Sequence, residues 1–194
     1  LVFVGLPWEY NNKLYNVAAA IQDGKLLGLV PKRWIPNYSE FYEGRYFNPG
    51  WEKTIEVSWD GYQVPMGMKL LFSCDNVENL VVGAEICEDV WVLNPPSIAH
   101  ASAGATVIVN CSASDEVTGK SEYRRSLISG QSARLLCAYI YAMRARESLP
   151  RISIFGGQNI IAENGNILSE SARFENQTIY ADIDLDVWNV SAAG

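Results

Sequence analysis

The segment GAEICEDVW places a cysteine, Cys87, directly after a strand candidate that runs from Leu80 to Ile86. A thiol that directly follows a strand lies where the strands of the sheet end, and there it can face a cleft. Two carboxylates, Glu88 and Asp89, follow at once, and burying such groups as plain core would be costly. The segment is compatible with a nucleophilic thiol, and equally with a core thiol that is followed by a solvated turn.

A thiol nucleophile needs a nearby cation, either to favour the thiolate or to stabilise the oxyanion that the thiol creates. The candidate is Lys32, in VPKRWIPNY, at the start of an aromatic and charged loop that runs from Pro31 to Gly50. Long loops inside compact domains are usually functional. Taken alone, however, Lys32 is more simply an ordinary surface lysine.

Several other chemistries lack their motifs. The sequence contains no G-x-S-x-G, no G-x-G-x-x-G and no G-x-x-x-x-G-K-[ST], so a serine elbow, a dinucleotide site and a P-loop are not indicated. The single histidine, His100, lies among small apolar residues, which favours a packed side chain over a Cys–His pair. With one histidine and no C-x-x-C spacing, no metal site is expected. We expect the cysteines to be reduced thiols.

Composition narrows the class of protein. The 194 residues are 48% hydrophobic and 19% charged, which is typical of one globular domain. The net charge of −7 argues against binding to a nucleic-acid backbone. The longest stretch without Asp, Glu, Lys or Arg, Val90 to Ser114, contains Asn, Pro and His and does not resemble a membrane span. No signal peptide is recognised. Reduced buried thiols are typical of a cytoplasmic protein, which is the location we expect.

Strand candidates outnumber helix candidates, which favours a layered α/β sandwich. Helices are expected from Pro95-Pro96 to Gly104 and from Lys120 to Cys137. Asp23-Gly24 is the strongest hairpin signal in the chain. The expected strands are Leu1–Val4, Leu14–Gln22, Lys25–Val30, Thr54–Trp59, Val64–Phe72, Leu80–Ile86, Thr106–Val109, Ala138–Ala142, Ile152–Ala162, Ile167–Phe174 and Thr178–Leu185.

A series of motifs in fixed order carries a resemblance. They include VPK, IPNY, EFYEGRYF, GAEICEDVW, NPPS, VNCSAS, GKSEYRR and QSARLLCAYIYA. From Gly5 to about Leu185 the chain resembles the glutaminase domains of glutamine-dependent NAD synthetases, a branch of the nitrilase (carbon–nitrogen hydrolase) superfamily. The resemblance implies a four-layer αββα sandwich that forms dimers, so we expect a homo-oligomer.

The resemblance also implies a Glu-Lys-Cys mechanism. Cys87 would attack the side-chain amide of glutamine and form a thioester, and Lys32 with the backbone N–H of Glu88 would hold the oxyanion. The implied substrate-binding residues are Tyr38, Glu43, Trp91, Ser114 and Lys120. Glu43 and Ser114 suit an ammonium or amide group, and Lys120 suits a carboxylate.

No cofactor is implied for this domain. In the family, the ammonia passes to a C-terminal synthetase domain, which uses ATP and, by implication, Mg²⁺ to amidate nicotinic acid adenine dinucleotide.

The chain also departs from the family. The family's catalytic Glu precedes the segment that matches Leu1, and its synthetase domain follows the part that matches this chain. We therefore expect residues 1–194 to be a partial glutaminase domain, truncated at the N-terminus, with an unpaired sheet edge prone to association. The segment Met143–Ser153 replaces a glycine-rich family segment, through either ordinary divergence or a short compensated frameshift.

Three functions remain open from the sequence. The first is the glutaminase part of an NAD synthetase, which the aromatic loop EFYEGRYF favours. The second is another nitrilase-superfamily amidase that acts on a free small amide. The third is a catalytically silent fragment or interaction module that keeps the geometry of the site but lacks a general base.

Overall fold

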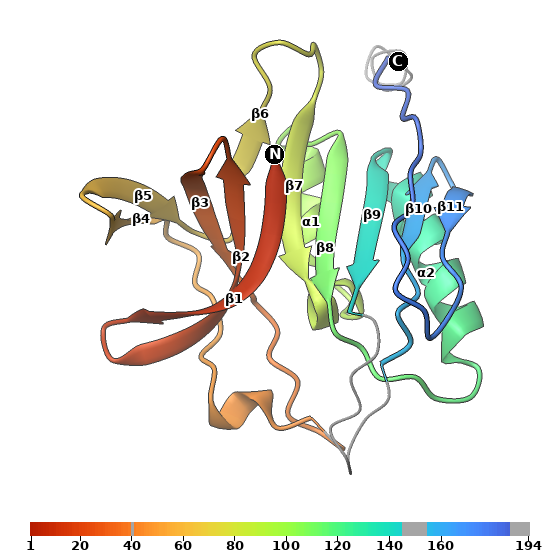
Figure 1. Ribbon diagram of the computed structural model, residues 1–194, viewed down its shortest axis with the longest axis horizontal. Coiled ribbons are helices and arrows are strands. Elements are labelled where there is room, and N and C mark those ends of the chain that lie inside the picture. The colour runs from red at the N-terminus through yellow and green to blue at the C-terminus, as the bar shows by residue number, and fades with distance from the viewer. Residues whose placement is uncertain (40, 145–154, 187–194) are drawn as a thin grey trace.

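The computed structural model describes residues 1–39, 41–144 and 155–186, and they fold into two facing β-sheets with helices on one side (Figure 1). The five-stranded sheet has the order β1-β2-β3-β5-β4, and the six-stranded sheet has the order β11-β10-β9-β8-β7-β6. The first sheet comprises β1 (Val2–Tyr10), β2 (Lys13–Gln22), β3 (Lys25–Pro31), β4 (Ile55–Trp59) and β5 (Tyr62–Met66). The second comprises β6 (Leu71–Ser73), β7 (Val81–Ile86), β8 (Val107–Ser112), β9 (Ala138–Met143), β10 (Ile160–Glu163) and β11 (Asn166–Glu170).

The centre of the six-stranded sheet is parallel, because β7, β8 and β9 run in the same direction. The helices α1 (Pro96–Ser102) and α2 (Lys120–Leu135) cover one face of this sheet, α1 over β7 and α2 over β9 to β11 (Figure 1). The core beneath the helices includes Ile108, Ile128, Tyr139 and Ile160, all fully buried. Covered on this side by helices and on the other by the second sheet, the parallel strands are almost continuously apolar.

The two sheets meet through small and apolar side chains, including Ala18 and Val30 on one side and Ala84 and Ile86 on the other. The five-stranded sheet also curls, since Trp8 of β1 lies 5.5 Å from Trp59 of β4, measured between ring centroids, although these strands are its opposite edges. Curling lets the sheet cover much of its own outer face. That face carries an apolar cluster without any helix of the described residues over it.

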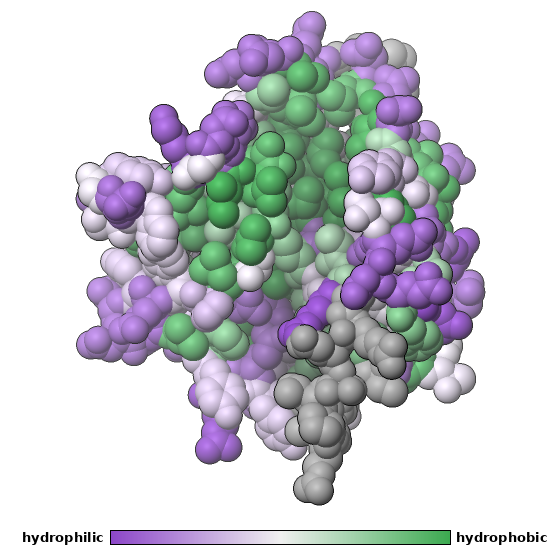
Figure 2. Space-filling view, viewed as in Figure 1, coloured by the Kyte–Doolittle hydropathy of each residue, from purple (hydrophilic) through white to green (hydrophobic). Residues whose placement is uncertain are grey.

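The first strand is an exposed edge. Among the described residues no strand pairs with the outer edge of β1, and Leu1, Val2 and Val4 are exposed. Figure 2 shows apolar residues gathered over the part of the surface where β1 and its neighbours lie. Contrary to the expected end of the strand near Val4, β1 continues through Pro7, which an edge strand tolerates because its N–H side can face away from the ladder.

The expected α/β fold with two sheets is confirmed, and the described residues contain one of the two helical layers of an αββα sandwich. The hairpin at Asp23-Gly24 and the helix that begins at Lys120 are also confirmed. In these described residues neither helix is long and apolar enough to cross a membrane.

Four further strand predictions need correction. The run from Val64 to Phe72 divides at Gly67, because β5 belongs to one sheet and β6 to the other. Between Thr178 and Leu185 there is no strand; Ile183 and Leu185 pack against the sheet instead, so their alternation reflects burial without backbone pairing. Of the predicted strand Ile152–Ala162, residues 152–154 lie outside the described residues, and β10 begins at Ile160. The predicted strand Ile167–Phe174 ends at Glu170. Most of the divergent segment Met143–Ser153, residues 145–153, lies outside the described residues.

Candidate active site

Cys87 stands where β7 ends and a 3-10 turn, Cys87–Val90, begins. Its φ is +44°, in the left-handed region that residues other than glycine rarely occupy. Such a conformation costs on the order of 1–3 kcal/mol and persists only where the surroundings impose it. The thiol is 8% exposed, and the sharp turn brings it to the end of the sheet, as the sequence predicted.

Hydrogen bonds from the neighbouring strands hold this turn. The backbone N–H of Cys87 donates to Oδ1 of Asn110 on β8 over 2.9 Å, and Nδ2 of Asn110 donates to the hydroxyl of Tyr139 on β9 over 3.1 Å. The Tyr139 hydroxyl in turn donates to the fully buried carboxylate of Glu85, which also accepts the backbone N–H of Ser97 at 2.8 Å. Burial raises the pKa of Glu85. The nucleophile candidate is therefore fixed by a buried polar chain that spans three strands.

Lys32 approaches the end of β7 from the other sheet, and it lines the same cavity as Cys87. It directly follows β3, is 1% exposed, and its backbone N–H donates to the carbonyl of Asn16 over 2.8 Å. Its Nζ donates to Oε2 of Glu43 over 2.7 Å, and Glu43 begins a 3-10 turn in the aromatic loop. The surface reading of Lys32 is therefore wrong. A buried lysine is favourable only with such a partner.

The side chains of Lys32, Glu43 and Cys87 line one cavity of about 370 Å³. It lies between the two sheets at the ends of β3, β7 and β8. A small amide of glutamine size can enter such a volume, since binding pockets start at roughly 300 Å³. The residues that line it are Gly5, Leu6, Pro7, Asn16, Lys32, Glu43, Phe47, Ile86, Cys87, Cys111, Ser112, Ala113, Ala142 and Arg144.

The other predicted site residues do not line this cavity. The Tyr38 hydroxyl donates to Oε1 of Glu88 over 2.9 Å, and burial together with this carboxylate raises the pKa of Tyr38. Nζ of Lys120 is bound to Asp115 and lies 5.5 Å from the ring centroid of Trp91.

Ser114 is buried beside Asp115, and its neighbour Ala113 lines the cavity. Glu88, whose backbone N–H is the predicted oxyanion donor, directly follows Cys87. The predicted site residues that do not line the cavity therefore form a second group, which consists of Tyr38, Glu88, Trp91, Ser114 and Lys120.

The sequence profile of the carbon-nitrogen hydrolase family matches residues 1–192, nearly the whole chain. The chain belongs to the carbon-nitrogen hydrolase family. Among curated relatives, the glutamine-dependent NAD(+) synthetase of Mycobacterium tuberculosis is 39% identical over 96% of this chain and 28% of its own length. The enzyme of the same name from Aquifex aeolicus is 33% identical over 95% of this chain and 29% of its own length. The chain thus spans less than a third of these relatives.

Solved structures agree with the family. The crystal structure of a glutamine-dependent NAD(+) synthetase from Cytophaga hutchinsonii matches with a TM-score of 0.77 and 30% identity, over 88% of this chain and 27% of that one. A carbon-nitrogen hydrolase from Helicobacter pylori matches with a TM-score of 0.77 over 98% of this chain and 64% of that one. At 18% identity, the second likeness supports the fold alone.

In this carbon-nitrogen hydrolase, the hydrogen bonds of two polar residues beside Cys87 were not predicted from the sequence. Asn110 follows a β-branched run, and its position near the end of β8 was the available signal. Asp89 stands two residues after the nucleophile candidate, but nothing in EICEDVW shows that its carboxylate accepts backbone N–H groups from the loop after β3. Such contacts between distant segments follow from sheet packing, which local patterns do not specify.

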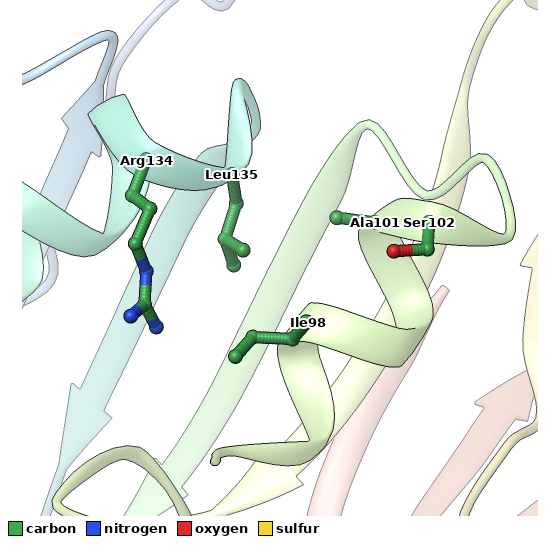
Figure 3. A pocket seen from close by; sticks show the side chains of 5 residues that line it. All are labelled: Ile98, Ala101, Ser102, Arg134 and Leu135. Carbon is green, nitrogen blue, oxygen red and sulfur yellow. The ribbon is translucent and has the colours of Figure 1, made fainter. Parts of the chain in front are cut away.

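A further cavity, of about 360 Å³, lies between the two helices on the outer layer (Figure 3). It is lined by Ile98, Ala101, Ser102, Arg134 and Leu135, and it contains no thiol or carboxylate. His100, on α1, is 1% exposed, and its Nε2 lies 2.7 Å from the carbonyl oxygen of Met68, which confirms a packed histidine. Among the described residues no group of three His, Cys, Asp or Glu side chains is arranged as metal ligands.

Proposed function

We propose that this chain is the glutaminase part of a glutamine-dependent NAD(+) synthetase, which releases ammonia from the side-chain amide of glutamine. The observation that carries the proposal is the single cavity that contains both the strained Cys87 and the buried Lys32. The two curated synthetases that are 39% and 33% identical support the substrate. The aromatic loop, which contributes Glu43 to the cavity, supports it further.

In the proposed reaction, the Cys87 thiolate attacks the amide carbon and forms a C–S bond. The carbonyl oxygen becomes an oxyanion, which Lys32 and the backbone N–H of Glu88 stabilise. The tetrahedral intermediate expels ammonia once the leaving nitrogen has gained a proton. Water then attacks the thioester, releases glutamate and restores the thiol.

We propose a separate general base for these proton transfers. Among the described residues that line the cavity, Glu43 is the carboxylate, and it is already bound to Lys32. The family resemblance suggests a glutamate N-terminal to the residues of this chain, and the fraction of the relatives' length that is matched, 28%, supports a longer protein. In that protein a synthetase domain would consume the ammonia with ATP and Mg²⁺, and the assembly would be a cytoplasmic homo-oligomer.

The second group of residues is proposed to hold the rest of the substrate. Tyr38, Trp91, Ser114 and Lys120 offer hydroxyl, aromatic and ammonium groups beside the cavity. Lys120 is bound to Asp115, so a substrate carboxylate would share or replace that carboxylate. Glu43 faces the cavity and suits the amide nitrogen or the substrate ammonium.

The test uses a glutamine-like electrophile, the diazoketone 6-diazo-5-oxo-L-norleucine, followed by peptide mapping. We expect Cys87 to be modified first, with loss of N₂ from the reagent, and free glutamine to protect it. Iodoacetamide, which lacks the glutamine backbone, is the control that measures general thiol reactivity. First modification at Cys74, Cys111 or Cys137 would overturn the proposal. Protection by a small amide such as propionamide, but not by glutamine, would favour the alternative amidase.

A further inference from the structure

Asp89 bonds the two sheets together beside the active site. It lies in the 3-10 turn two residues after Cys87 and is 1% exposed. Its Oδ1 accepts the backbone N–H groups of Arg33 at 3.1 Å and Trp34 at 2.7 Å. Its Oδ2 accepts the backbone N–H of Ile86 at 3.0 Å. One carboxylate therefore binds the end of β7 and the segment after β3 at the same time.

The segment that Asp89 binds begins directly after Lys32. The chain leaves the sheet at this point, because β3 ends at Pro31. The backbone of Lys32 is still held by Asn16 and by the N–H of Gly50, which donates to the Lys32 carbonyl over 2.7 Å. Beyond Lys32, the contacts to Asp89 fix the next two backbone N–H groups.

We propose that Asp89 is a positioning residue that keeps the Lys32 ammonium in the same cavity as the Cys87 thiol by tying the backbone after β3 to the catalytic turn. The proposal rests on the roles proposed above for Cys87 and Lys32. Asp89 itself does not line the cavity, so it acts through these two residues and not on the substrate.

The substitution Asp89→Asn removes half of this arrangement with almost no change in volume. The amide oxygen can still accept from Arg33 and Trp34, but the amide NH₂ then faces the N–H of Ile86. Two donors that face each other in a buried site are unfavourable. If the amide is reversed, its NH₂ group instead faces the N–H groups of Arg33 and Trp34. In either orientation residue 89 loses its hydrogen bonds to one of the two segments, either the end of β7 or the segment after β3.

The test compares the alkylation of Cys87 by iodoacetate and by iodoacetamide, measured by peptide mapping. A cation beside the thiol attracts the anionic reagent, so the ratio of the two rates reports how close Lys32 stays to Cys87. In Asp89→Asn we expect the ratio to fall by about tenfold. Glu116→Gln is the control, because the Glu116 side chain is also buried, 6% exposed, and its partners, Arg124 and Arg173, belong neither to the catalytic turn nor to the segment after β3. We expect this control to lose stability but to keep the ratio.

A second pair of variants leaves Asp89 intact and covers the case in which Asp89→Asn does not fold. Trp34→Pro deletes the N–H that donates over 2.7 Å, whereas Trp34→Ala removes the same side chain and keeps that N–H. We expect the proline variant alone to lower the ratio. An unchanged ratio in the folded Asp89 or proline variant would overturn the role of Asp89 and leave the proposed function standing. If the unmodified chain shows no preference for iodoacetate at Cys87, the catalytic role of Lys32 fails, and the role of Asp89 fails with it.

Discussion

Cys87 and Lys32 reach one cavity from two sheets that hold them in different ways. Cys87 is fixed within the six-stranded sheet, where its N–H binds Asn110 on the neighbouring strand and a buried chain continues to Glu85. Lys32 lies just beyond its strand, and its side chain depends on Glu43, a residue of the long loop. The thiol is therefore held by regular structure, and the cation by contacts between separate segments.

The difference predicts which half of the site is the more easily disturbed. Parallel strands that are covered on both faces form the interior of the fold, so the turn at Cys87 opens only with the core. The segment that follows Lys32 belongs to no strand, and its position depends on a few polar contacts. Mutations on the Lys32 side should change the chemistry with little loss of stability, whereas mutations behind Cys87 should reduce stability and reactivity together.

The largest effect is expected for Cys87→Ala. In a protein that contains this chain and a synthetase domain, glutamine-driven synthesis should fall by on the order of 10⁴ or more, because the nucleophile is gone. Ammonia-driven synthesis should be spared, since it bypasses the thioester. Measuring both activities on one preparation provides the internal control. Equal loss of both would show that Cys87 has a structural role.

The next effect is expected for Lys32→Met, which keeps the length of the side chain and removes the cation. Loss of one oxyanion donor costs about 10²–10³ in rate, so thioester formation at Cys87 should slow by that factor. The rate is measured with glutamine itself under single-turnover conditions, as the first release of ammonia. Glu43→Gln is the companion variant: it removes the ion pair but leaves the cation in place. A slowing in Glu43→Gln as large as that in Lys32→Met would assign the effect to the ion pair instead.

The same difference explains which parts of the site the sequence predicts. The strand before Cys87 and the glycine that ends α1 have local signals, namely an apolar run and a C′ residue, and the structure confirms both. Gly104 takes a φ of +98°, which suits glycine at that position. Local patterns therefore place the nucleophile at a strand end before any tertiary contact is known.

The contacts on the Lys32 side have no such local signal. Lys32 and Glu43 are eleven residues apart across a loop, and Asp89 accepts N–H groups from residues more than fifty positions away. The hydrophobic pattern also does not separate burial from strand pairing, as the unpaired segment around Ile183 shows. The need for a cation singled out Lys32 as a candidate and the family resemblance provided Glu43, whereas only the packed sheets reveal the contacts of Asp89.

A smaller effect is expected for Asn110→Ala, which removes the acceptor behind Cys87. The buried N–H of Cys87 then lacks a partner, so the free energy of unfolding should fall by about 1–3 kcal/mol. The rate of Cys87 alkylation should also fall relative to the other three cysteines, because the hydrogen bond to Asn110 no longer holds Cys87 in its left-handed conformation. Thr106→Val is the matched control, since Oγ1 of Thr106 accepts the backbone N–H of Val81 over 3.1 Å at the start of β7, the end of that strand away from Cys87. A drop in alkylation in the control as well would mean that general loosening of the sheet is responsible.

The last prediction concerns pH and tests Asp89, which bonds to both halves of the site. Burial raises the pKa of Asp89 to about 7, although backbone N–H groups and Lys32 oppose the change.

In the unfolded chain the pKa of an aspartate is about 3.9. Between about pH 4 and pH 7, Asp89 is therefore more fully protonated in the folded state than in the unfolded state. The free energy of unfolding should therefore fall as the pH rises through this range, by at most about 1.4 kcal/mol per pH unit, and level off above pH 7. Burial lowers the pKa of His100 and works in the opposite direction below pH 6.5, whereas Glu85 adds to the trend. The measurement is urea unfolding of the unmodified chain and of Asp89→Asn at each pH. The difference between their free energies of unfolding removes the contributions of His100 and Glu85, which both proteins share. A difference between the two proteins that does not change with pH would show that Asp89 stays ionised in the fold, held by its three N–H donors.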